Sequence, residues 1–350
     1  MDTIEIAIKL NNTFTNINEI NTLIYNIENI KSNYGYNFCN VLELSRTGNL
    51  IVKISYPRFY KGTNAFLITR RSECFEVQRY LVYNLLREYE VNGIIQGIVL
   101  NRVDIPFTYL MNIDECFTGY QNIFYILANV YNKKLSGIST KGYINLLERE
   151  MEIVIYSPNK NNCSGKNYNS RLEIYNQYLN LESKLPTELF EEITKTYSDL
   201  PQRIRMEVSK RIRLRRTFNT FEFENLDILG NYFENYKKYI LDNFLDFKEI
   251  ERLYSLRANE LANWLMERRK QGKINYTEFI YQNQGLILDY EVVRRALGLA
   301  IDNVNTRENA ITKVRKILFE YENLNNVIIV DTYKILKNIY NTISTTILLD

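Results

Sequence analysis

Charged and tyrosine side chains alternate with apolar ones along four segments of the chain. In 98–109 the polar members are Arg102 and Asp104, and the apolar members are Val99, Val103, Ile105 and Phe107. The polar members of the other segments are Glu150 and Glu152 in 150–156, Arg171, Glu173 and Tyr175 in 170–177, and Arg203, Arg205, Glu207, Arg211, Arg213 and Arg215 in 203–215. Residues i and i+2 of a strand point to the same side, so each polar set shares one face if these segments are strands.

Such a face would combine carboxylates, guanidinium groups and a phenol. Grouped carboxylates repel one another unless an arginine or a metal cation lies between them. The guanidinium fork matches the geometry of phosphate, and a carboxylate-bound divalent ion polarises a phosphodiester that a tyrosine can attack. The pattern is thus typical of a phosphoryl-transfer site. A solvated face of an antiparallel sheet alternates in the same way, and both interpretations stay open on periodicity alone.

The composition narrows the chemistry further. The chain has 350 residues and no histidine, which excludes Ser-His-Asp and Cys-His catalysis and histidine-ligated zinc. The four cysteines lie far apart, without the paired spacing of a zinc or redox motif, and are interpreted as reduced thiols: Cys39, Cys74, Cys116 and Cys163. Carboxylates with an oxygen-preferring divalent ion are the toolkit that remains.

The elements that would position these residues form an α+β pattern. Strands are predicted at 3–10, 40–46, 50–56, 98–109, 151–156, 170–176 and 203–214, and helices at 17–33, 73–90, 116–132 and 187–198. Adjacent hairpins predict a mainly antiparallel sheet with helices on one face. After about residue 225 the pattern becomes helical, at 226–244, 247–271, 290–302, 307–323 and 331–348. We therefore predict a domain over 1–222 and a C-terminal all-helical domain over 223–350.

Basic residues cluster near the end of the strand-rich half. The stretch 203–216 has seven basic residues and one acid, Glu207. It predicts nucleic-acid contact through Arg203, Lys210, Arg211, Arg213, Arg215 and Arg216, or else a solvated strand surface. The helix at 247–271 ends on three more cations, which either contact DNA or a helicase or are solvated ends of a bundle. No apolar run is long enough to span a bilayer, and the first ten residues read as a strand, so a cytoplasmic protein without a membrane partner is expected.

Four segments carry a resemblance to a known family. They are IVKISYPRFYKGTNAFLIT (51–69), with Ser55, Pro57, Gly62 and Asn64, LNRVDIPF (100–107), NSRLEIYNQYLNLE (169–182) and RIRMEVSKRIR (203–213). In this order and spacing the chain resembles, over about 40–215, the rolling-circle replication initiators of filamentous phages and transposase-like plasmids (Rep_trans type). The absence of histidine matches the carboxylate-based type and not initiators with a His-hydrophobe-His metal motif.

The resemblance implies an enzyme that nicks one strand of plasmid or phage origin DNA. It implies that Tyr175 attacks the scissile phosphate, leaving a 5′-phosphotyrosine link and a 3′-OH primer, while Arg102, Arg171 and Arg205 position phosphates or stabilise charge. Asp104 and Glu207 would hold Mg²⁺ or Mn²⁺, with Glu173 or Glu152 completing the set. A host helicase and a second copy of the chain, as a homodimer, are further expected partners.

Two positions depart from the family pattern and keep other functions open. Gln177 stands where the family has lysine, and Asn180 stands where it has an acid, with Glu182 the nearest substitute. Glutamine can neither neutralise a transition state nor favour the tyrosinate. A non-catalytic DNA-binding regulator on the same scaffold is one alternative, and a mobile-element protein that binds and inhibits a host protein is another. Tyr156 and Tyr178 are the alternative nucleophiles.

Overall fold

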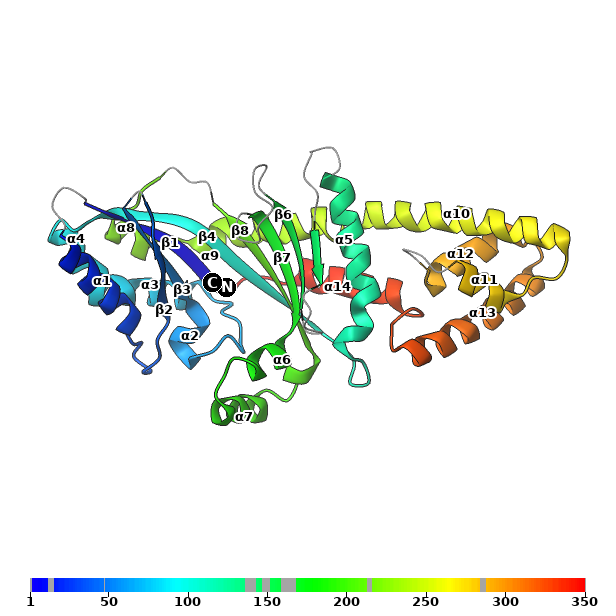
Figure 1. The fold of residues 1–350 in the computed structure, drawn as a ribbon, viewed down its shortest axis with the longest axis horizontal. Helices are drawn as coiled ribbons and strands as arrows, with labels where there is room; N and C mark the ends of the chain where they lie inside the picture. Colours follow the sequence, from blue (N-terminus) through cyan, green and yellow to red (C-terminus); the bar gives the residue numbers. More distant parts are fainter. Residues whose placement is uncertain are drawn as a thin grey trace. The chain divides into compact units, whose positions relative to one another are not determined.

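The computed structural model describes residues 2–11, 16–46, 48–135, 143–146, 152–158, 168–212, 216–283 and 288–349, with the backbone alone over the described parts of 131–170. Strands and helices are both present throughout the first two thirds of the chain, so the predicted α+β class is confirmed (Figure 1). From Thr220 onward the named elements are helices.

The strands form one sheet in the order β2-β3-β1-β4-β8-β7-β6-β5. Their bounds are β1 Thr3–Leu10, β2 Cys39–Leu44, β3 Asn49–Ser55, β4 Ile95–Leu110, β5 Tyr143–Leu146, β6 Glu152–Pro158, β7 Tyr168–Asn176 and β8 Arg203–Arg211. The pairs β1–β3, β1–β4, β2–β3 and β7–β8 are antiparallel, as predicted, and Figure 1 shows β7 beside β8. The hairpin between β2 and β3 contains Gly48, whose φ of 74° suits glycine at a tight turn.

A β-bulge in β4 corrects one predicted face. Glu5 of β1 pairs with Arg102, but Ile6 pairs with Leu100, so one residue of β4 is extra at this point. Beyond the bulge the alternation reverses, because an added residue shifts the following side chains to the other side. Ile98 and Leu100 are consequently buried, whereas Val99 is only half-buried. The prediction from strict alternation, which placed Val99 on the apolar face, is therefore wrong. Val103, Ile105 and Phe107 are buried as expected.

Helices accompany the sheet in the strand-rich part of the chain. They are α1 Ile17–Asn29, α2 Tyr56–Lys61, α3 Arg71–Leu81, a π-helical turn Val82–Leu86, α4 Arg87–Val91, α6 Gln177–Glu182, α7 Thr187–Thr196, α8 Thr220–Glu224 and α9 Ile228–Asn243. The Tyr80 hydroxyl of α3 donates to the carbonyl of Lys31, which follows α1, at 2.8 Å. Arg87 of α4 forms an ion pair with Glu224 of α8 at 3.0 Å. These two contacts join residues that are 49 and 137 positions apart in the chain.

The segment 51–69, expected as a strand and a turn, contains a helix between them. After β3 the chain enters α2, whose first turn contains Pro57, and α2 ends at Gly62 with φ of 67°. Proline in the first turn and a left-handed glycine at the end are ordinary helix-boundary signals. The short helix was missed because six residues are too few to show a helical period.

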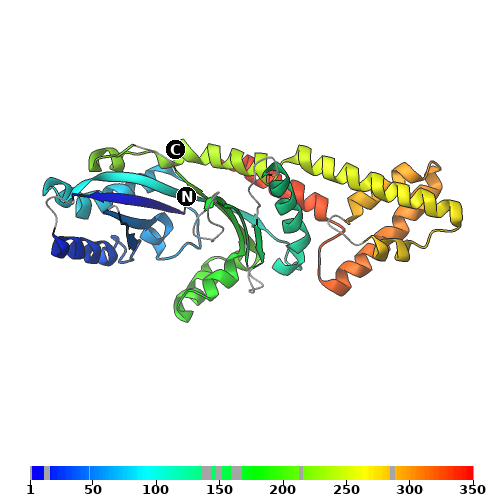
Figure 2. The same cartoon turned by 45° about the horizontal axis from the view of Figure 1, so that its top comes forward.

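The remaining helices are α5 Gln121–Leu135, α10 Phe247–Gln271, α11 Tyr276–Gln282, α12 Tyr290–Ala300, α13 Val304–Asn325 and α14 Thr332–Thr345. Figure 2 shows α12 and α13, in orange, beside the end of the long yellow α10. Asp246 caps α10 by accepting from the amides of Lys248 and Glu249, and this cap explains why α10 begins where the pattern predicts. Among the described helices, none is both long and apolar enough to cross a membrane.

The chain divides into two compact units. The first, here the sheet unit, comprises Met1–Thr108, Tyr156–Lys237 and Thr346–Asp350. The second, here the helical unit, comprises Tyr109–Ile155 and Lys238–Thr345. The boundaries between the two units thus differ from the predicted domain boundary between 222 and 223. One reason is that α5 belongs to the same unit as most of the C-terminal helices.

Candidate active site

The strands β7 and β8 bring together the tyrosine and three of the charged residues selected from the sequence. In the antiparallel register Tyr175 lies opposite Arg205, and Glu173 lies opposite Glu207. The Tyr175 hydroxyl donates a hydrogen bond to Oε1 of Glu207. The pleat therefore places a phenol next to a carboxylate that can accept its proton.

This part of the polar face is enclosed. The exposed fraction is 4% for Tyr175 and 1% for Arg205, which is the largest fully buried side chain in the described residues. An outer face that merely meets water leaves its charged side chains exposed. The solvated-face interpretation is therefore wrong for these two positions.

One backbone carbonyl ties a distant loop to this group. The carbonyl of Asn64 accepts from Nε2 of Gln177 at 2.9 Å and from Nη2 of Arg205 at 3.3 Å. Gln177, which replaces the family's lysine, is 1% exposed. A neutral amide at this position avoids placing a second buried cation beside Arg205. The departure at Gln177 is thus a structural feature of the buried group.

Several buried polar atoms around this group have hydrogen-bonding capacity that the described protein atoms do not use. They are Nε and Nη1 of Arg205, Oδ1 of Asp2, Oδ1 of Asp104, Oγ of Ser209 and Oε1 of Gln177. Buried polar groups in folded proteins are nearly always hydrogen-bonded, and exceptions concentrate at binding and catalytic sites. Their concentration along β1, β4, β7 and β8 marks this region as a candidate site.

The enclosure also changes the acidity of the two partners. Burial, with the charges of Asp2 and Glu173, raises the pKa of Glu207 to about 8. Burial and the charge of Glu207 raise the pKa of Tyr175 well above its ordinary value of 10, against an opposing contribution from Arg205. The phenol is thus held in its neutral form, and the carboxyl group next to it titrates near neutral pH.

The acidic residues fit a divalent cation by their chemistry. Asp2, Glu173 and Glu207 supply the hard oxygen donors that Mg²⁺ and Mn²⁺ prefer, and a cation would relieve the repulsion that raises the pKa of Glu207. Glu173 is paired with Arg171 at 2.5 Å. In the described part of the chain, no three acidic or thiol side chains already converge as metal ligands. Glu152 lies on β6, and its side chain is outside the described residues.

Arg102 and Asp104, both on β4, form a second charged group with Glu5 of β1. Arg102 contacts Glu5 at 3.2 Å and Asp104 at 3.0 Å, and both acids are buried. The two residues share a face, as alternation predicts. The charge of Asp104 also raises the pKa of Tyr236 on α9, after burial as the main cause. The Asp104 carboxylate contacts Arg102, and the Asp104 carbonyl accepts from the amide of Asp2 at 3.3 Å, whereas the Glu207 carboxylate accepts from Tyr175.

The basic residues expected to contact DNA have different surroundings. Arg203 binds Asp199 through two nitrogens, at 2.8 and 2.9 Å, and donates to the carbonyl of Ala65 at 2.6 Å. Arg216 is exposed and pairs with Glu222 at 2.7 Å. Lys210 is half-buried and Arg211 is exposed on β8, whereas Arg213 and Arg215 are outside the described residues.

A polar cavity of about 330 Å³ adjoins the Tyr175 group within the sheet unit. Asp2 and Asn64, which contact or face that group, also line the cavity, together with Asn40, Lys53, Ser55 and Arg58. Sequence reasoning missed Asp2 and Ser209 because neither belongs to a motif. Asp2 immediately precedes a strand, and Ser209 continues the alternation of Arg205 and Glu207, which is the one signal that could have identified it.

Glu207→Gln is expected to stabilise the folded protein increasingly as the pH rises. The folded-state pKa of about 8 lies above the unfolded value of about 4.3, so between these limits the folded chain binds more protons than the unfolded chain. The parent therefore loses stability from about pH 5 to about pH 9, and the variant does not. The difference between variant and parent should grow by about 1.4 kcal/mol per pH unit and approach about 5 kcal/mol above pH 8, measured by urea unfolding across this range.

Two comparisons make this test specific. Mn²⁺ should reduce the loss in the parent at high pH and leave Glu207→Gln unchanged, if these acids hold the ion. Glu222→Gln should differ from the parent by a constant amount across this range, because the amide of Asn219 and then Arg216 lower the pKa of Glu222 and confine its titration to acidic pH. A parent whose stability does not fall between these pH values would contradict the buried, repelled state of Glu207.

No protein-family model, curated protein or solved structure matches this chain.

Proposed function

We propose that this protein is a replication initiator that nicks one strand of plasmid or phage origin DNA by attack of Tyr175. The observation that carries the proposal is the part-buried hydrogen bond from Tyr175 to Glu207, with Arg205 across the strand pair. A nucleophile paired with a base and flanked by a cation is the arrangement that activated nucleophiles share. The four segments that resemble initiators of the carboxylate-based type support the same reaction.

In the proposed reaction the Tyr175 oxygen forms a bond to the scissile phosphorus, and its proton passes to Glu207. The bond between phosphorus and the 3′ oxygen breaks, and that oxygen takes up a proton to become the 3′-OH primer. Arg205 compensates the charge that develops on the phosphate, which the unused Nε and Nη1 donors support. Arg171 and Arg102 would position phosphates from neighbouring parts of the same face.

Glu207, Glu173 and Asp2 would hold the Mg²⁺ or Mn²⁺ ion, with Asp104 and Glu152 as the remaining acids of the proposed set. The ion, when bound, would lower the charge on the phosphate and offset the repulsion among the acids. The cavity beside Asp2 and Asn64 is lined by the cations Lys53 and Arg58 and by the acids Asp2 and Glu28, and the two cations would contact the phosphates of a bound strand. Arg211 and Arg216 would add sequence-independent phosphate contacts, and Arg203, Lys210, Arg213 and Arg215 complete the proposed DNA-binding set.

The proposal is tested by incubating the full chain with supercoiled DNA of its own replicon and Mn²⁺, with a chelator as the control. We expect a nicked circle, a protein–DNA adduct that survives denaturation, and a 5′-phosphotyrosine at Tyr175 in the digested adduct. The chelator should remove both products. DNA that the protein binds but never nicks, with Mn²⁺ or with Mg²⁺, would refute the nickase proposal.

In that event the second candidate, a non-catalytic DNA-binding regulator, becomes the function. The specific observation in its favour is Gln177, a buried amide at the position where the family has a lysine. Failure to bind DNA at all would leave the third candidate, a mobile-element protein that inhibits a host protein. A cytoplasmic location, a host helicase and a homodimer are parts of the initiator proposal.

A further inference from the structure

The helical unit contains a second candidate binding site, at the turn between α10 and α11. A cavity of about 270 Å³ is lined there by Trp264, Arg268, Gln271, Lys273, Asn275 and Glu278, among others. Trp264, the one tryptophan of the chain, is half-buried and packs against Phe279 with ring centroids 5.2 Å apart. The guanidinium of Arg268 lies 5.1 Å from the centroid of the Trp264 ring. An aromatic ring and a cation thus share one small cavity.

The charge around this cavity favours an anionic partner. Residues 267–278 include the cations Arg268, Arg269, Lys270 and Lys273 and the acids Glu267 and Glu278, a net charge of +2. Arg268 and Lys273 are exposed. Glu278 lies 4.0 Å from Arg268, so it opposes an anion there only through a loose, solvated pair.

We infer that this cavity binds an unpaired base of single-stranded DNA by stacking on Trp264, with the flanking phosphates on Arg268 and Lys273. Stacking on aromatic rings together with cations along the backbone is how proteins bind single strands without reading sequence. The cavity is smaller than the roughly 300–1,000 Å³ that drug-sized ligands occupy, which suits one base. A base inside a duplex is already stacked and cannot enter. The choice of DNA rests on the proposed nicking, which leaves one strand to be displaced.

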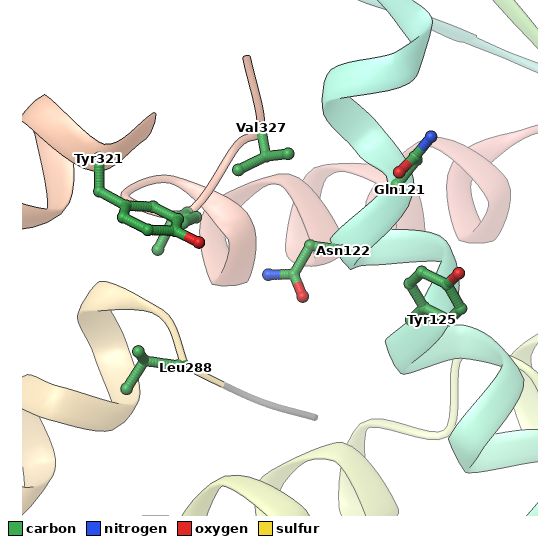
Figure 3. Close-up of a pocket in the computed structure, with 7 residues that line it drawn as sticks. Gln121, Asn122, Tyr125, Leu288, Tyr321 and Val327 are labelled. Carbon is green, nitrogen blue, oxygen red and sulfur yellow. The ribbon is translucent and has the colours of Figure 1, made fainter. Parts of the chain in front are cut away.

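A second cavity in the helical unit has a different lining. It has a volume of about 230 Å³ and is lined by Gln121, Asn122, Tyr125, Leu288, Tyr321, Val327 and Ile329 (Figure 3). Figure 3 shows the amide of Asn122 and the ring of Tyr321 at this space, among aliphatic side chains. These lining side chains are uncharged and supply no phosphate contact, so this cavity is not assigned to nucleic acid.

The single tryptophan provides the test. The full chain is titrated with an oligothymidylate of roughly 12 nucleotides, within the site sizes of single-strand binding modules, while Trp264 fluorescence is recorded. We expect saturable quenching by the single strand and none by a duplex of equal length. Quenching by the duplex alone, or tighter binding of the matching oligouridylate, would overturn the inference. A fluorescence signal that does not change at saturating oligothymidylate would also overturn it.

Charge variants show whether the phosphate contacts are at this cavity. Lys273→Gln and Arg268→Gln should each weaken binding several-fold and lower the slope of log affinity against log salt by about 0.7. Lys313→Gln, a change of an exposed charge on α13 outside the lining of this cavity, should do neither. Equal effects of Lys273→Gln and Lys313→Gln would overturn the site. Trp264→Ala should lower the affinity for the single strand about 10- to 100-fold, and Trp264→Phe should retain most of it. Because both variants lack the tryptophan, their binding is measured with a labelled oligonucleotide.

The outcome is separable from that of the proposed nicking. Tyr175→Phe, which lacks the proposed nucleophile in the other unit, should quench like the parent. If the parent chain shows quenching by the single strand but never nicks DNA, the nickase proposal is refuted and the Trp264 site is retained. If it nicks DNA without quenching, the Trp264 site is refuted and the nickase proposal is retained.

Discussion

Tyr175→Phe is expected to lower nicking of replicon DNA by at least about 10³-fold and to abolish the protein–DNA adduct, because the variant has no oxygen to attack phosphorus. Phenylalanine keeps the ring of a side chain that is only 4% exposed, so the fold should be retained. The variant loses the hydrogen bond to Glu207, a stability change of about 1–2 kcal/mol. Adduct formation on denaturing gels and urea unfolding measure the two effects.

A neighbouring tyrosine supplies the matched control. Tyr178→Phe removes one hydroxyl three residues along the chain from Tyr175, from a half-buried ring that packs against Phe190 with centroids 5.0 Å apart. It should nick and form the adduct like the parent. If Tyr175→Phe remains active and Tyr178→Phe or Tyr156→Phe does not, the nucleophile moves to that residue while the enzyme class stands.

Arg205→Met should be the most destabilising substitution in the candidate site. Arg205 is 1% exposed and its positive charge lowers the pKa of both Glu207 and Tyr175. Methionine fills a similar volume but leaves Asp2, Glu173 and Glu207 without this cation. Removing one partner from a buried charge group is expected to reduce the free energy of unfolding by about 3–5 kcal/mol and to abolish nicking. Urea unfolding at neutral pH measures the loss.

A double-mutant cycle shows whether the loss comes from the charges. Arg205→Met combined with Glu207→Gln should recover about 1–3 kcal/mol of the single-variant loss, because the added substitution removes one unpaired acid. Arg216→Met, which removes an exposed arginine, should change stability by less than about 1 kcal/mol. Additive effects of Arg205→Met and Glu207→Gln would contradict a shared charge group and assign the loss to packing.

The local alternation of apolar and polar residues was enough to predict on which side of β7 and β8 each side chain lies. Ile174 and Met206 are buried on one side, and Tyr175 and Glu207 meet on the other, because the pleat alone decides which side each residue takes. The start of α10 could also be predicted from local sequence, because Asp246 caps the helix by accepting from amides two and three residues further on. The class of the fold, most strands and the longer helices follow from periods of this kind.

Contacts between distant segments could not be predicted in this way. The bulge in β4 depends on how Glu5 and Ile6 pair with residues about ninety positions later, so Val99 was placed on the wrong side. The membership of α5 in the helical unit likewise depends on contacts with helices at the far end of the chain. Neither effect has a signature within a window of a few residues.

The sequence by itself therefore determined which side chains could act together, and it selected Tyr175, Arg205, Glu207 and Glu173 before any contact was known. Only the tertiary structure decided that Tyr175 and Arg205 are buried, that Asp2 joins the acids, and that the carbonyl of Asn64 accepts from both Arg205 and Gln177. The physical reason is that alternation is a property of one strand, whereas burial, charge repulsion and hydrogen-bond partners depend on the strands and loops that the fold brings alongside it.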